Sequence, residues 1–206
     1  AFQLTTVFYQ VPVFVYKDGS CAFSCVLSRS LCLALRCWAM TFCIFFRMEG
    51  KSYAKGCTLP REELRYLRVL HYDKEGQEHT GELVCHYSIA DDLLAIFLAL
   101  YKAKHPVERM VLIDESDADD EASMQANNTS VFNYRQASGM RTLSKHSTGM
   151  AIDINPLYNP LVKHRNGHTR VYPSTATPYI DRTKDFPYKI EKGDLCYRLF
   201  KQHGFR

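Results

Sequence analysis

Regularly patterned apolar side chains begin after Arg47, where they first mark a hairpin of two strands. Leu64 to Tyr72 has the pattern of a strand, Asp73-Lys74-Glu75-Gly76 that of a turn, and Gly81 to His86 that of a returning strand. An antiparallel pair is therefore predicted, with its turn near Gly76.

The segment after this hairpin is predicted to be a helix. Ser88-Ile89-Ala90-Asp91 resembles a capping box. Apolar residues then recur at helical spacing, at Leu93, Leu94, Ile96, Phe97 and Leu100. Pro106 should end the helix near His105, because the residue before a proline avoids helical backbone angles.

Three shorter elements follow. Arg109 to Ile113 is predicted to be an apolar strand that leads into the acidic stretch Asp114 to Glu121. This stretch lacks the glycine and the distal glutamate of an EF-hand loop, so a solvated connection is favoured over a calcium site. Met150 to Ile154 is predicted to be a further strand, and Asp194 to His203 a last helix that Gly204 should terminate.

Irregular alternation of strands and helices, with hairpins, is typical of an α+β protein. We predict a single domain over residues 47–206, with a small antiparallel sheet flanked by helices. Residues 1–46 differ, being rich in Phe, Val, Leu and Cys and without helical or strand periodicity. Their apolar stretch from 31 to 46 has 16 residues and contains Arg36, which is short of the roughly 20 that span a bilayer. It is either a remnant of an export signal or anchor, or a damaged or mis-started N-terminus.

Composition adds limits to this picture. With 46% hydrophobic and 23% charged residues, the 206-residue chain is globular rather than mainly disordered. Its net charge of +4 comes from basic residues that are scattered along the sequence, which argues against nucleic-acid binding. No cysteine spacing forms the C-x-x-C pairs of a structural zinc site, and we expect Cys85 and Cys196 to be buried as small hydrophobic residues.

The candidate chemistry lies in the stretch from Ser144 to Asn155. Two ligands of one zinc ion lie about 3 to 3.5 Å apart, because each donor atom is about 2 Å from the metal. His146 and Asp153 are seven positions apart, and a fully extended chain would separate them by roughly 23 Å. The backbone must therefore reverse, and the reversal is expected at Ser147-Thr148-Gly149, where glycine tolerates unusual angles. In the strand that follows, Ala151, Asp153 and Asn155 should share one face, while Met150, Ile152 and Ile154 enter the core.

The pattern S-x-H-x-x-G-x-A-x-D resembles the zinc-binding motif of the D-alanyl-D-alanine carboxypeptidase family, which includes VanY-like enzymes and L-alanyl-D-glutamate endolysins. The resemblance runs from about Arg47 to the end of the chain. It is most specific in S-K-H-S-T-G-M-A-I-D-I-N-P-L-Y-N-P and in D-D-E-A-S-M-Q-A-N-N-T-S-V-F-N-Y-R. It implies that His146 and Asp153 bind Zn²⁺, and that Arg135 holds the substrate and polarises the scissile carbonyl. The alternative for Arg135 is a surface salt bridge, and Tyr158 is either a cleft wall or part of the core.

In that family the third zinc ligand and the catalytic base lie in an H-F-E-like segment after a helix that ends in G-F. Here Gly204-Phe205 is followed only by Arg206, so we expect a peptidase domain that is incomplete at its C-terminus, with neither the third histidine nor the glutamate present. Nothing in the spacing of His164 and His168 recommends them as substitutes, and His203 lies at a helix end, where a positive charge is favourable.

The resemblance therefore implies a zinc metallopeptidase of peptidoglycan stem peptides, of the carboxypeptidase type. The alternatives are a catalytically inactive peptidoglycan-binding domain and an L-alanyl-D-glutamate endopeptidase. A wall substrate implies action outside the cytoplasm, in the periplasm or wall, as a secreted or membrane-tethered protein. We expect a monomer without nucleic acid and without any cofactor other than the metal.

Overall fold

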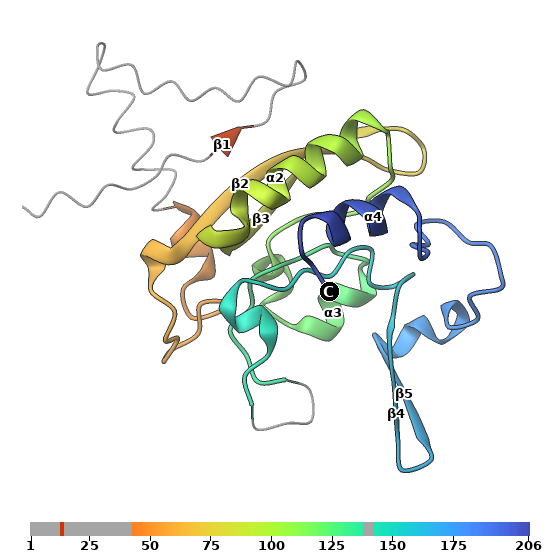
Figure 1. The fold of residues 1–206 in the computed structure, drawn as a ribbon. Coiled ribbons are helices and arrows are strands. Elements are labelled where there is room, and N and C mark those ends of the chain that lie inside the picture. The colour runs from red at the N-terminus through yellow and green to blue at the C-terminus, as the bar shows by residue number, and fades with distance from the viewer. Residues whose placement is uncertain (1–12, 15–42, 138–141) are drawn as a thin grey trace, which may run out of the picture.

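The computed structural model describes residues 13–14, 43–137 and 142–206 (Figure 1). Its central hairpin consists of β2 (Leu64–Tyr72) and β3 (Glu78–His86), paired antiparallel from Leu64↔His86 to Tyr72↔Glu78. The bounds of β2 agree with the prediction, whereas β3 starts three residues earlier than predicted. A two-residue strand, β1 (Val13–Phe14), pairs parallel with β2 and makes the sheet order β1-β2-β3.

Helix α2 (Tyr87–Lys102) follows β3 directly and lies along the sheet (Figure 1). The predicted capping box at Ser88 to Asp91 is wrong. His86 is the N-cap, and its ring accepts a hydrogen bond from the Ser88 backbone N–H at 3.2 Å. The helix is therefore capped by the side chain of His86 and not, as predicted, by that of Ser88. It ends at Lys102, three residues before His105.

The apolar face of α2 packs on the sheet and on the last helix, α4 (Leu195–Gln202). The central cluster takes Leu67 and Val69 from β2, Leu83 and Cys85 from β3, Leu93, Ile96, Phe97 and Leu100 from α2, and Cys196 and Phe200 from α4. The burial expected for Cys85 and Cys196 is confirmed. Helix α4 is capped by Asp194, whose carboxylate accepts from Tyr197 N–H, and Gly204 follows it with a left-handed φ of 83°, as predicted.

Three segments from later in the chain pair with the outer edge of β3. Glu82 N–H donates to the Met110 carbonyl at 2.9 Å, and His86 N–H donates to the Gly149 carbonyl at 2.9 Å. Between them the Val84 carbonyl accepts from Phe132 N–H at 3.1 Å. The edge of the hairpin therefore holds the loops that carry the predicted site.

The predicted strands at 109–113 and 150–154 do not form. Each contributes a single isolated bridge, Arg109↔Asn128 and Ser130↔Asp153. In the first segment, side-chain bonds from Asn128 to both backbone groups of Val111 replace a ladder. The segment 150–154 lies between two residues with left-handed backbone angles, Gly149 (φ 66°) and Asn155 (φ 45°), which interrupt an extended strand at both ends. Ile152 and Ile154 pack against the core as expected, but Met150 is 50% exposed.

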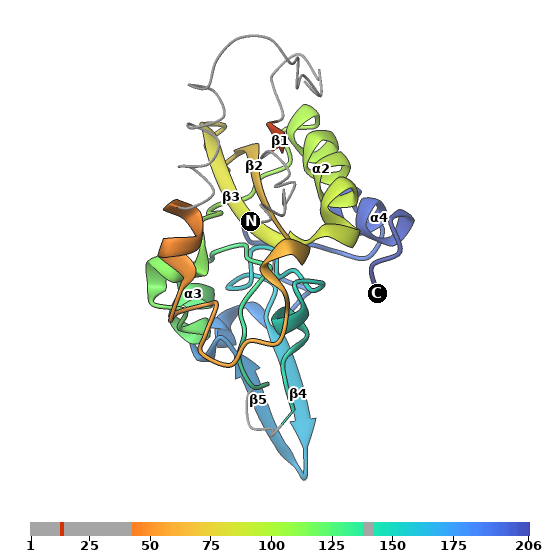
Figure 2. The same ribbon diagram turned by 90° about the vertical axis from the view of Figure 1, so that its left-hand side faces the viewer.

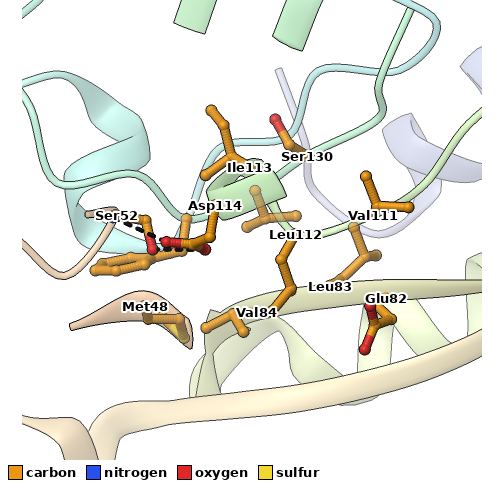
Figure 3. A pocket seen from close by; sticks show the side chains of 12 residues that line it. Met48, Ser52, Glu82, Leu83, Val84, Val111, Leu112, Ile113, Asp114 and Ser130 are labelled. Atoms are coloured by element: carbon orange, nitrogen blue, oxygen red, sulfur yellow. Dashed lines mark hydrogen bonds between the residues drawn. The ribbon is translucent and has the colours of Figure 1, made fainter. Parts of the chain in front are cut away.

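The acidic stretch 114–121 is solvated only in part, since Glu115, Asp117 and Asp119 are exposed while Asp114 is buried and the stretch is largely helical. It forms the 3₁₀ helix η2 (Ile113–Ser116) and the start of α3 (Asp120–Gln125). The Asp114 carboxylate is buried and accepts from the backbone N–H and hydroxyl of Ser52, both at 3.0 Å (Figure 3). Burial raises the pKa of Asp114, although the bonds from Ser52 oppose that shift.

A second hairpin was not predicted. β4 (Leu161–Arg165) and β5 (His168–Tyr172) pair antiparallel around Asn166-Gly167, which has positive φ at both residues. Such a two-residue turn matches the twist of the strands it connects. Three further 3₁₀ helices are η1 (Arg61–Glu63), η3 (Lys145–Thr148) and η4 (Ser174–Tyr179), and residues 43–48 are helical.

The expected N-terminal segment falls mostly outside the described residues, so its boundary at residue 47 stays a prediction. Among the helices of the described ranges, none combines the length and apolar character needed to cross a membrane.

Candidate active site

A tight reversal of the backbone at Ser144 to Gly149 brings the two predicted metal ligands together. Ser144 caps η3, because its hydroxyl accepts from the His146 N–H at 3.3 Å. Gly149 ends η3 in the left-handed region and donates its N–H to the His146 carbonyl at 3.0 Å. The reversal expected at Ser147-Thr148-Gly149 is therefore present.

Gly149 is required here by space as well as by conformation. A Cβ built on it would lie 2.7 Å from the backbone N of His86, closer than real Cβ atoms approach. The glycine can therefore press its carbonyl against the edge of β3, which fixes η3 relative to the sheet.

The side chains of His146 and Asp153 meet, with Nε2 of the histidine 3.2 Å from Oδ2 of the aspartate. Nδ1 of His146 lies 2.6 Å from the Val131 carbonyl oxygen, and a carbonyl can only accept, so this nitrogen carries a proton. Nε2 is thus the nitrogen that faces the carboxylate. The backbone of Asp153 is held by Ser130 through a reciprocal pair of hydrogen bonds of 3.0 and 3.2 Å.

Burial lowers the pKa of His146, but the hydrogen bond and the negative charge of Asp153 raise it by more, so the net pKa lies above the ordinary value. The two groups attract through the atoms that would face a shared cation. A nitrogen and an oxygen 3.2 Å apart also match the separation of two ligands that each lie about 2 Å from one zinc ion. The donor chemistry and the spacing therefore fit a divalent metal.

Arg135 is built into the same turn as His146. Its backbone N–H donates to the Ser147 hydroxyl oxygen at 3.0 Å, and its carbonyl accepts from that hydroxyl at 2.8 Å and from Ser144 N–H at 2.9 Å. The residues that resemble the substrate-binding and metal-binding groups are thereby joined by short bonds to one turn.

The guanidinium of Arg135 forms a salt bridge with Asp120 at the start of α3, with Nη2 2.5 Å from Oδ2. About three quarters of each side chain is buried, so this is more than the surface pair considered as an alternative. Asp120 also contributes to the raised pKa of His146, which places its charge within electrostatic reach of the imidazole. The Arg135 Nε is buried and finds no partner among the described residues. Sequence reasoning missed Asp120, which was assigned to a solvated run.

Asn155 is a second residue whose role the sequence did not reveal, and it is fully buried. Its side-chain oxygen accepts from Glu108 N–H at 3.0 Å, and its side-chain nitrogen donates to the Pro106 carbonyl at 3.1 Å. Its own N–H donates to the Thr129 hydroxyl at 3.2 Å. One amide side chain thus ties the end of the Asp153 segment to two other loops.

The other histidines considered as ligands lie in other surroundings. His164 and His168 are exposed on the β4–β5 hairpin, and His164 bonds to Thr169. His203 pairs with Asp92 at 2.8 Å. Within the part of the chain that the structure describes, no group of three His, Cys, Asp or Glu side chains could hold a metal.

Tyr158 belongs to an aromatic cluster, with ring centroids 4.6 Å from Tyr179 and 5.4 Å from Tyr188. The aromatic packing therefore accounts for Tyr158, which favours the alternative of core packing over that of a cleft wall.

Two cavities lie away from the His146–Asp153 pair. One of about 10 Å³ beside Asp114 has room for a single water at most (Figure 3). The other, of about 390 Å³, is lined by His71 and Glu108 among others, and neither His146 nor Asp153 lines either cavity.

Comparison with known proteins finds a family similarity over the last third of the chain. The model of the D-alanyl-D-alanine carboxypeptidase family matches residues 138–206. The match contains His146, Asp153 and α4, whereas Arg135 and Asp120 precede it. It confirms the resemblance for the motif at Ser144 to Asp153 and supports a peptidase-like function, whereas the resemblance of residues 47–137 lies outside the match. Searches of the curated proteins and of the solved structures gave no match.

The turn at Gly149 gives a direct test of how the site is built. Gly149→Ala should lower the free energy of unfolding by about 2–4 kcal/mol, because it adds left-handed strain and a clash with the edge of β3. Gly167→Ala is the matched control, since φ is +74° there but nothing lies within 4 Å of the added Cβ. Its cost should be about 1 kcal/mol. Urea unfolding measures both, and equal losses would contradict the close approach.

Proposed function

We propose that this chain carries the metal-binding core of a zinc-dependent peptidase that acts on peptidoglycan stem peptides, of the D-alanyl-D-alanine carboxypeptidase type. The observation that carries the proposal is the His146–Asp153 pair. Its donor atoms converge to 3.2 Å, and the Val131 carbonyl fixes the tautomer that presents Nε2. The family match over residues 138–206 supports the same conclusion.

When bound, zinc would supply a Lewis acid and a water of lowered pKa that can attack a peptide carbonyl. His146 and Asp153 would hold the ion, with the imidazole kept in orientation by its bond to Val131. Arg135 would bind the carbonyl or terminal carboxylate of the substrate, because a guanidinium presents a planar fork of donors to two oxygens. Asp120 would keep that fork in place.

A catalytic zinc site has three protein ligands and a nearby carboxylate base. In the resembling family the third ligand and the base follow a G-F pair, which here is Gly204-Phe205. Phe205 packs against the same hydrophobic cluster as Ile152 and Ile154, the neighbours of Asp153. In a longer form of the protein, residues supplied after Arg206 would start from the side of the hydrophobic cluster where Phe205 packs on Phe200 of α4.

The substrate class sets the place of action. Stem peptides lie outside the cytoplasm, so the proposal includes export, or release by lysis. A carboxypeptidase needs a pocket for a free terminal carboxylate, whereas an endopeptidase needs an open cleft. Product analysis on a stem peptide separates these, since release of D-alanine indicates the first and cleavage after L-alanine the second.

The metal site can be tested without turnover. Residues 1–206 should bind one zinc ion weakly, as measured by competition with a chromogenic chelator. His146→Ala should weaken this binding at least tenfold, because one of two donors is lost. His203→Ala is the control, since it removes an imidazole that pairs with Asp92 at another place. Wild-type zinc affinity in His146→Ala would refute the assignment, as would D-alanine release by a longer form that carries the substitution.

The role of Arg135 and Asp120 predicts a loss of substrate binding with zinc binding unchanged. Arg135→Lys and Asp120→Asn should each weaken binding of a peptide ending in D-alanyl-D-alanine about tenfold by calorimetry, since a charge-assisted bond contributes about 1.5–3 kcal/mol. Asp185→Asn removes an exposed carboxylate elsewhere and should change nothing. Peptide affinity that is unaltered in Arg135→Lys would remove the proposed role.

A further inference from the structure

The β4–β5 hairpin extends away from the sheet and from α2 in both views of the molecule (Figures 1 and 2). Residues 161–172 contain Lys163, Arg165 and Arg170, two histidines and no acidic residue. Three of the 26 basic residues therefore lie on one projecting element that carries no acidic residue to balance them.

The strand register places these charges on a single face. Lys163 is directly opposite Arg170, and Arg165 is directly opposite His168. Directly opposed residues share a face of the hairpin, as do residues two apart along a strand. Lys163, Arg165, His168 and Arg170 therefore form one cationic face, while Val162, His164, Thr169 and Val171 form the other.

This arrangement is unfavourable for the hairpin itself. Like charges directly opposite each other destabilise a strand pair, and a two-stranded hairpin is only marginally stable alone. None of the three cations forms an ion pair with the described residues, and Arg165, His168 and Arg170 are exposed. Lys163 Nζ lies 5.3 Å from the ring centroid of Tyr172 on the same face, but this contact does not involve Arg165 or Arg170, whereas a polyanionic ligand would account for all three cations.

We propose that the cationic face of the β4–β5 hairpin binds a flexible chain of phosphodiester-linked polyols in the cell wall. The naming of a wall polymer rests on the proposed function. Cations about 5 Å apart across the strands and about 7 Å apart along them can contact successive phosphates of a flexible chain. Single-stranded nucleic acid would need a row of aromatic side chains for base stacking, and Tyr172 is the single aromatic residue of the hairpin. A membrane would favour an apolar tip, but the tip is Asn166-Gly167.

The test measures binding of residues 1–206 to fluorescent poly(glycerol phosphate) by anisotropy. Three phosphate contacts predict a slope of about −2 for log affinity against log salt, so affinity should fall about 16-fold between 50 and 200 mM NaCl. Lys163→Gln, Arg165→Gln and Arg170→Gln combined should lower affinity at least tenfold at the lower salt. The same variant should keep or raise its midpoint of thermal unfolding, because repulsion between opposed cations is relieved.

The control removes three charges elsewhere, with Lys102→Gln, Lys192→Gln and Lys201→Gln combined, and should keep its affinity within twofold. Equal loss in both triple variants would overturn the proposal, as would tighter binding to a single-stranded oligonucleotide or to phosphatidylglycerol vesicles. Zinc binding is measured on the same proteins. A chain that binds the polymer through the hairpin but takes up no zinc would sustain this inference and remove the proposed function.

Discussion

Backbone hydrogen bonding along the outer edge of β3 is the constraint on which the site depends. Glu82, Val84 and His86 offer alternate groups on that edge, and each is taken by a different loop. The loop at Phe132 leads to Arg135, and the loop at Gly149 joins His146 to Asp153. A regular strand in this place would have satisfied the edge but carried no polar cluster. The irregular segments form hydrogen bonds with the edge of β3 and also allow polar side chains from different loops to meet at the candidate site.

Buried polar side chains make these irregular segments stable. A loop that does not continue a ladder leaves backbone groups that cost free energy when buried. Asn128 satisfies both backbone groups of Val111, and Asn155 satisfies groups of Pro106 and Glu108. The amide side chains thus provide hydrogen-bond partners for the backbone of the loops, as neighbouring strands do for the backbone of β2. They also explain why buried polar residues surround the candidate site.

Local patterns predicted the elements whose stability is local. β2 and α4 have their expected bounds because apolar periodicity and capping by Asp194 are written in adjacent residues. The predictions of strands around Arg109 and Met150 were wrong, because the pairing of these segments depends on partners that are far away in the sequence. Asp120 was missed for the same reason, because its partner Arg135 lies beyond a buried loop. The β4–β5 hairpin was missed although its signal is local. Asn166-Gly167 is typical of a two-residue hairpin turn, and this pattern was sufficient to predict it.

The bonds between Arg135 and Ser147 have a mechanical consequence. The cation and the imidazole are attached to one short turn, so any motion of that turn carries both together. The spacing between the backbones of Arg135 and His146 is then set by hydrogen bonds within the turn rather than by loop closure. The Asp153 segment is held separately, because Asn159 donates its side-chain N–H groups to the carbonyls of Ile154 and Asn155, the two residues that follow Asp153.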